Sequence, residues 1–137
     1  MAGISTKGSY GLAAMYELAL HYGQGHLQIR DIADKANIPS NYLEQILSTL
    51  RKEGMIQSIR GAGGGYLLAK APNQIQVYMI LFALEGELCL PADEGVQPVL
   101  HLYWERVKEE MRTVFHETLQ DLVDKGNELN QQTMYFI

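Results

Sequence analysis

The first seventy residues place apolar side chains at the spacing of short amphipathic helices. Apolar positions three and four residues apart predict a first helix that begins at the N-caps Ser5 or Thr6 and runs to about Tyr22. A second apolar face predicts a two-turn helix over residues 30–36. Asn37 is expected to end this helix, because asparagine tolerates left-handed backbone angles.

A third helix and a hairpin are predicted to follow directly. The apolar pattern predicts a helix over residues 40–53, in which Asn41 and Glu44 have the spacing of a capping box. Short β-prone runs at residues 55–59 and 66–69 flank a glycine-rich stretch, which is typical of a hairpin with a flexible tip. Two helices joined by a short turn and followed by a hairpin predict a winged helix-turn-helix.

The second half of the chain is predicted to be mainly helical. A fourth helix is expected over residues 76–84, and the glycine- and proline-containing stretch 85–97 is expected to be a loop. Residues 98–125 predict one long helix whose apolar positions step by four and three, as in a coiled-coil seam. These seam residues are Leu100, Trp104, Val107, Met111 and Val114. A single chain would expose this stripe, so we expect a homodimer.

These elements predict a mostly α protein with a small β wing, which is an α+β fold. The expected organisation is a winged helix-turn-helix domain over residues 1–84, a loop over 85–97, and a dimerisation helix with a C-terminal tail over 98–137.

The charge distribution indicates where a nucleic acid would bind. The 137 residues carry a net charge of -5, which by itself argues against such a partner. Residues 1–72, however, hold seven basic and five acidic side chains, whereas residues 73–137 hold four basic and eleven acidic ones. A phosphate-facing surface is therefore expected only in the N-terminal half.

Cysteine content and hydropathy indicate the compartment. Cys89 is the only cysteine, which excludes an internal disulfide and a metal site built from several thiolates. The N-terminal residues lack a signal-peptide pattern, and no stretch approaches the roughly 18 apolar residues of a membrane span. We therefore expect a cytoplasmic protein that is not bound to a membrane. It is not expected to be an enzyme, because no paired carboxylates, activated nucleophile or metal-ligand spacing stands out.

The third predicted helix carries side chains suited to reading bases. If its apolar residues face the core, Asn41, Glu44 and Gln45 lie on the opposite face. Asparagine and glutamine can bind adenine, glutamate can accept from cytosine, and Arg51 suits phosphate or guanine. An ordinary helical pair with a solvated polar face would show the same pattern.

The predicted hairpin favours the DNA-binding interpretation. Its consecutive glycines let the backbone approach a phosphate or enter a narrow minor groove, with Arg60 beside them. A nucleotide-binding glycine loop does not fit, because these glycines join two strands and do not open a helix. A plain flexible hairpin remains an alternative.

Three segments resemble the Rrf2 family of winged-helix regulators. They are ISTKGSYGLAAMYELA, SNYLEQILSTLRKEGMIQSIRGAGGGYLL and LEGEL, and the resemblance spans essentially the whole chain. It implies DNA contacts at Ser5, Thr6, Lys7, Tyr10, Ser40, Asn41, Tyr42, Glu44, Gln45, Arg51, Arg60, Gly61, Gly63, Gly64 and Gly65. Many members have arginine where this chain has Ser9, so one phosphate contact is expected to be lost.

The resemblance also bears on cofactors. Iron–sulfur members hold their cluster with three cysteines in the loop before the long helix, whereas this loop holds Cys89 alone. We therefore expect no cofactor and no metal. Cys89 is interpreted as a small apolar residue or a redox-sensitive thiol. The four histidines lack metal-ligand spacing and are interpreted as surface or packing residues.

Within the family, the chain most resembles the cluster-free CymR type, whose members repress cysteine metabolism. The apolar end MYFI resembles the tail with which serine acetyltransferase enters cysteine synthase. Tyr135, Phe136 and Ile137 are therefore predicted to dock into that enzyme, or alternatively to pack against their own dimer.

The resulting prediction is a homodimeric transcription regulator, a repressor, that binds double-stranded DNA at a palindromic operator and controls cysteine or sulfur metabolism. Two alternatives stay open. One is a regulator of the same fold that senses a ligand or redox change through loop 85–97. The other is a protein-interaction module that has the fold but does not bind DNA.

Overall fold

A computed structural model of the chain describes residues 3–87 and 97–135. Its elements are α1 (Thr6–Leu20), α2 (Ile29–Ala36), α3 (Ser40–Lys52), β1 (Ile56–Ile59), β2 (Gly65–Leu68), the 3-10 helix η1 (Pro72–Gln74), α4 (Val77–Glu85), α5 (Pro98–Phe115) and α6 (Leu119–Tyr135). The predicted mostly α fold with a small β wing is confirmed. No helix in the described part of the chain is long and apolar enough to cross a membrane.

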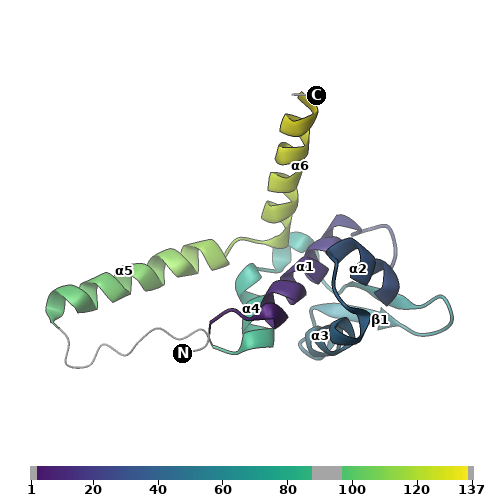
Figure 1. The fold of residues 1–137 in the computed structure, drawn as a ribbon, viewed down its shortest axis with the longest axis horizontal. Coiled ribbons are helices and arrows are strands. Elements are labelled where there is room, and N and C mark those ends of the chain that lie inside the picture. Colours follow the sequence, from purple (N-terminus) through teal and green to yellow (C-terminus); the bar gives the residue numbers. More distant parts are fainter. Residues whose placement is uncertain (1–2, 88–96, 136–137) are drawn as a thin grey trace.

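Helix α1 organises the core. Helices α2, α3, α4 and α6 all pack against it, as Figure 1 shows. Met15 of α1, Ile32 of α2, Leu47 of α3 and Ile80 of α4 are fully buried and belong to one cluster. Burying a side chain of this size stabilises the fold by about 1.5–3 kcal/mol, so α1 holds the helix-turn-helix and α4 together.

Two of the three predicted helix ends are confirmed. Ser5 is the N-cap of α1, and its hydroxyl oxygen accepts a hydrogen bond from the Lys7 amide. Asn37 ends α2 in the left-handed region at φ 57°. The predicted capping box of α3 is wrong, because α3 begins at Ser40 with Pro39 as its N-cap and no capping side chain. The Pro39 carbonyl accepts the first helical hydrogen bonds, so α3 starts before the predicted cap.

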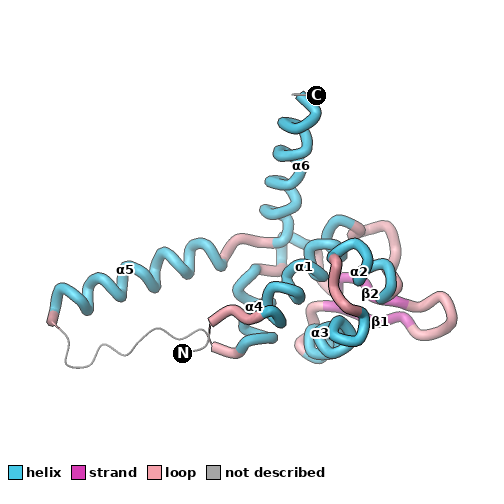
Figure 2. Tube along the Cα trace, in the orientation of Figure 1, coloured by secondary structure: helices cyan, strands magenta, loops and turns pink. Residues whose placement is uncertain are grey.

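The wing consists of β1, β2 and the turn of residues 60–64 between them. The strands pair antiparallel, from Ile56 opposite Leu68 to Ile59 opposite Gly65. Figure 2 shows this hairpin beside α2 and α3. Leu27 forms an isolated β-bridge with Tyr66, in which its amide and carbonyl each form a 2.8 Å hydrogen bond. The segment between α1 and α2 thereby supports the wing.

The single long helix predicted over residues 98–125 is wrong. Residues 116–118, here called the elbow, separate α5 from α6. Thr118 and Asp121 cap the start of α6 reciprocally, with N–H to side-chain oxygen distances of 2.9 and 3.1 Å. Leu119 then enters the main core with no exposed surface. This reciprocal cap and the burial of Leu119 both favour the start of a new helix at this point.

The elbow is bonded to the segment before α4. The Val77 amide donates to the Glu117 carbonyl, and the Leu119 amide donates to the Ile75 carbonyl, both at 2.9 Å. Beyond the elbow, α6 packs on α1, whereas α5 extends away from the rest of the molecule in Figure 1. None of the 18 residues of α5, all of them described, is buried.

Candidate nucleic-acid interface

Helix α3 divides cleanly into a buried and an exposed face. Its apolar side chains Leu43, Ile46, Leu47 and Leu50 are all at most 1% exposed. The opposite side, here called the recognition face, is exposed and comprises Ser40, Asn41, Tyr42, Glu44 and Gln45. The side-chain donors and acceptors that the sequence predicts to read bases are therefore accessible on the surface. The same leucines and isoleucine fix the helix rigidly, which keeps the recognition face in one orientation.

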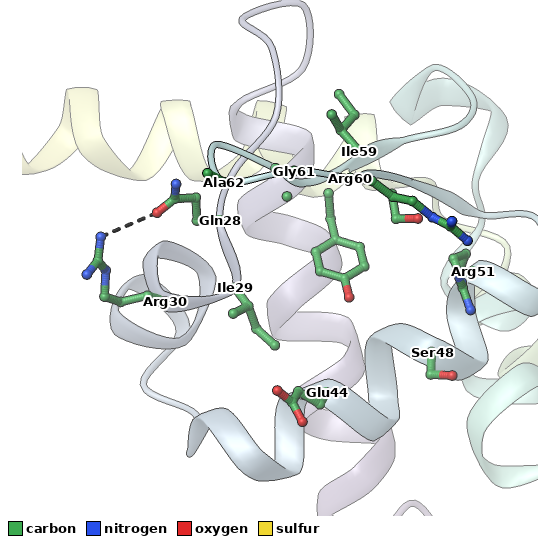
Figure 3. A pocket seen from close by; sticks show the side chains of 14 residues that line it. Gln28, Ile29, Arg30, Glu44, Ser48, Arg51, Ile59, Arg60, Gly61 and Ala62 are labelled. Carbon is green, nitrogen blue, oxygen red and sulfur yellow. Dashed lines mark hydrogen bonds between the residues drawn. The ribbon is translucent and has the colours of Figure 1, made fainter.

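A groove of about 910 Å³ lies between the start of α2, the side of α3 and the wing. Arg30, Arg51 and Arg60 line it from these three elements, together with Glu44 (Figure 3). The Gln28 side chain accepts a hydrogen bond from the Arg30 guanidinium at 3.3 Å, which restricts how that arginine can swing. With three arginines and one carboxylate among its lining residues, this groove is a favourable place for phosphate.

The wing carries the predicted glycines to the rim of this groove. Gly61, Gly64 and Gly65 line it, and Gly61 is exposed at φ 114°. The Gly64 amide donates to the Gly61 carbonyl at 3.0 Å, which closes the turn tightly. Gly63 is exposed within the same turn, and its carbonyl accepts a hydrogen bond from His26.

The start of α1 is capped from the end of α4. Oε1 of Glu85 accepts hydrogen bonds from the Ser5 hydroxyl at 2.6 Å, the Gly8 amide at 2.7 Å and the Ser5 amide at 2.9 Å. The Ser5 hydroxyl, more than the backbone amides or Lys7, holds the pKa of Glu85 below its usual 4.5. A Cβ on Gly8 would lie 2.6 Å from this oxygen, so only glycine admits the carboxylate.

This capped helix start lies beside the recognition face. The Tyr10 and Tyr42 rings meet edge to face with centroids 5.5 Å apart, which joins the second turn of α1 to the first turn of α3. Thr6 is exposed and Lys7 is half-buried in the first turn of α1. The Ser5 hydroxyl is engaged with both Glu85 and the Lys7 amide, so Ser5 serves the helix start as well as any outside contact.

Sequence reasoning left several groove residues unassigned. Arg30, Gln28 and Tyr66 line the groove, yet they were not predicted as site residues. Gln28 and Arg30 are distant in sequence from the glycines, and the pairing of Leu27 with Tyr66 is what brings them beside the wing. His26 was interpreted as a surface or packing residue, although it bonds to the wing turn.

The predicted dimer seam runs along α5. Leu100 and Val114 are 47% and 57% exposed, and Trp104, Val107 and Met111 are half-buried. Val107, Met111 and Val114 line a shallow hollow of about 270 Å³ on the side of the helix.

The predicted docking tail and the cysteine lie at the edge of what the structure describes. Tyr135 is the last residue of α6. Phe136, Ile137 and Cys89 lie outside the described residues. The docking of this tail into cysteine synthase, and both interpretations of the thiol, therefore stay predictions.

Comparison with known proteins places this geometry among transcription regulators. Residues 4–125 match the Rrf2 family, described as iron-dependent transcriptional regulators. The chain is 38% identical to the HTH-type transcriptional regulator CymR of Bacillus subtilis over 137 residues, covering 98% of this chain and 99% of the relative. It is 33% identical to IscR of Pectobacterium atrosepticum, covering 93% and 82%. The solved structure of CymR, the global cysteine regulator of B. subtilis, matches with a TM-score of 0.85 and 39% identity, covering 91% and 98%.

The residues present do not fit an iron–sulfur cluster of the thiolate type. Such a cluster needs about four cysteine or histidine ligands, and this chain has one cysteine. Within residues 3–87 and 97–135, no three histidine, cysteine or acidic side chains come together. The iron in the family's description therefore has no matching set of ligands among these residues.

Proposed function

Because this chain belongs to the Rrf2 family of DNA-binding transcription regulators, we propose that it is a repressor that inserts α3 into the major groove of its operator. The observation that carries the proposal is the clean division of α3, whose four core residues are buried while the whole recognition face is exposed. A major groove about 12 Å wide admits one helix, and Asn41 and Gln45 can pair there with adenine. The protein acts on DNA and therefore belongs in the cytoplasm.

The arginine-lined groove supplies the contacts that hold α3 in register. Arg51 lies on the flank of α3, Arg60 lies at the start of the wing turn and Arg30 lies on the first turn of α2. A DNA backbone that passes between α3 and the wing would meet all three guanidinium groups. Such contacts carry no sequence information, but they supply affinity that falls steeply with salt.

The operator is proposed to be palindromic because the protein is proposed to be a homodimer. The support is α5, which has no buried residue of its own and carries a continuous apolar seam with a hollow at Met111. A second copy of α5 is the occupant that matches this seam, since the same spacing of apolar side chains fills such hollows in coiled coils. Similarity to CymR, the global cysteine regulator of B. subtilis, supports cysteine metabolism as the regulated pathway.

Capture of genomic DNA by the purified protein, followed by titration of the recovered sites, tests this function. Wild-type protein should bind a recovered site far more tightly than random duplex, and Gln45→Ala should weaken that specific binding by roughly 1–3 kcal/mol. Gln131→Ala, the same change at an exposed position of α6, is the matched control and should have no effect. Salt-independent binding, or full operator affinity in Gln45→Ala, would refute the proposal.

A further inference from the structure

The fold itself requires a bare backbone at three glycines of the wing. Gly61 has a φ of 114°, which other residues rarely adopt. A Cβ on Gly64 would lie 2.0 Å from the Ile59 carbonyl oxygen, and a Cβ on Gly65 would lie 2.2 Å from the Leu27 carbonyl oxygen. Both carbonyls belong to paired strands and cannot move aside. These three glycines are explained by contacts within the chain.

Gly63 has no such explanation within the described residues. A Cβ there would meet no described atom within 4 Å, and its φ lies outside the left-handed region. Glycine at such a position raises the entropy lost on folding and so destabilises the folded state relative to alanine. Contacts among the described residues therefore give no reason for the lack of a side chain at this exposed position, which leaves a contact outside the chain as its explanation.

The His26 side chain contacts the wing turn at Gly63 and Gly65. Its Nε2–H donates a hydrogen bond to the Gly63 carbonyl. Its Cδ2 lies 2.9 Å from the position that a Cβ on Gly65 would take, so the ring packs on the bare Cα of that residue. The next residue, Leu27, is tied to Tyr66 by two backbone hydrogen bonds. One imidazole therefore contacts the turn at two points, and the β-bridge of the next residue to Tyr66 fixes its own position.

We propose that His26 is a positioning residue for DNA binding. It holds the wing turn so that Gly63 contacts the sugar–phosphate wall of a minor groove. This minor groove is the one next to the major groove that α3 reads. The inference rests on the proposed function and adds a residue that the sequence did not assign. The turn borders the arginine-lined groove, with Arg60 at its start (Figure 3). A bare backbone at the point of closest approach lets the groove wall come within van der Waals distance. Because the hydrogen bond already orders the turn, the turn loses no further conformational entropy when it contacts DNA.

Two substitutions separate the hydrogen bond of His26 from its packing. His26→Phe keeps a flat ring over Gly65 but has no donor, whereas His26→Gln keeps an N–H that can reach the Gly63 carbonyl. His26→Phe should weaken operator binding about threefold to tenfold, the worth of one neutral hydrogen bond, and His26→Gln should restore most of it. His21→Phe, the same change at the end of α1, is the matched control and should leave binding unchanged.

Footprinting of the operator distinguishes positioning from a general loss of stability. Hydroxyl-radical cleavage reports the sugars that the wing covers, and dimethyl sulfate reports guanine N7 in the major groove. In His26→Phe, sugar protection at the wing should fade while guanine N7 protection by α3 persists. If both protections fall together, or if neither changes in His26→Phe, the inference is wrong. If wild-type protein protects no DNA at all, the proposed function fails instead.

Gly63→Ala tests the same contact without touching the histidine. The added methyl group enters open space in the free protein, so the melting temperature should stay equal or rise slightly. Sugar protection at the wing should nevertheless weaken, because the methyl group stands between the backbone and the groove wall. A Gly63→Ala variant with an unchanged footprint and unchanged operator affinity would overturn the inference, whether or not the His26 variants fold.

Discussion

Replacing Glu85 by glutamine should destabilise the protein by about 0.3–1 kcal/mol at neutral pH. The carboxylate caps α1 through three hydrogen bonds from Ser5 and Gly8. A side-chain cap at a helix N-terminus is worth about 0.5–2 kcal/mol, and a negative charge there adds about 0.3–1 kcal/mol at an accessible site. Glutamine keeps a neutral acceptor of the same length, so the expected loss is the charged part of this total.

The effect should depend on pH in a defined direction. Folding lowers the pKa of Glu85 below 4.5, so the folded state binds the proton more weakly than the unfolded state. The stabilisation is therefore fully present above the unfolded pKa and is lost as the pH falls through the folded pKa. Wild type and Glu85→Gln should differ most near neutral pH and converge in acid.

Urea denaturation followed by circular dichroism, at one fixed protomer concentration, measures this difference at each pH. Glu128→Gln, which removes an exposed charge from the far part of α6, is the control and should show no such dependence. A gap between wild type and Glu85→Gln that stays constant from neutral pH into acid would show that the charge of Glu85 does not cap α1. Equal stability at neutral pH would show that the negative charge of Glu85 adds nothing to the cap.

Leu119→Ala should lower the free energy of unfolding, measured by urea denaturation, by about 2–5 kcal/mol, because Leu119 is fully buried. The same change at exposed Leu129 is the control and should cost less than about 0.5 kcal/mol. Met111→Lys should convert the proposed dimer to a monomer in sedimentation, and a wild type that is monomeric at micromolar concentration would contradict the proposed dimer. Lys7→Ala should weaken binding to operator and to random DNA alike, and it should reduce the slope of log affinity against log salt concentration by about 0.9. A loss of affinity for the operator alone would contradict a phosphate contact. Protein purified without oxygen should be colourless in its absorption spectrum, and a visible band that scales with iron and sulfide would overturn the expectation of no cluster.

The sequence predicted those parts of the structure that depend on neighbours along the chain. The apolar spacing of α3 named the four buried residues and therefore the exposed recognition face. Ser5 and Asn37 could be assigned because a cap is a local interaction. The elbow was also signalled locally, by Thr118 and Asp121, but a continuous apolar stripe outweighed that signal.

Interactions between distant segments could not be predicted in this way. Glu85 caps a helix that begins eighty residues earlier, and no local pattern pairs it with Ser5. His26 reaches Gly63 because the β-bridge between Leu27 and Tyr66 holds this segment against the wing. The roles of the individual wing glycines likewise depend on which carbonyl each one faces, which is a property of the folded backbone.

The elbow also bears on how such a regulator can change over evolutionary time. Because residues 117 and 119 are bonded to residues 75–77, the end of α5 is fixed to the core independently of how long α5 is. Insertion of one helical turn would lengthen α5 by about 5.4 Å without disturbing Leu119 or α6. In the proposed dimer, that change would alter the separation of the two DNA-reading helices by an amount comparable to one or two base-pair steps of about 3.4 Å. Operator spacing and fold stability would then be encoded in different segments of the gene. Small insertions in α5 could change the operator spacing that the protein recognises during evolution, while its DNA-reading domain stayed intact.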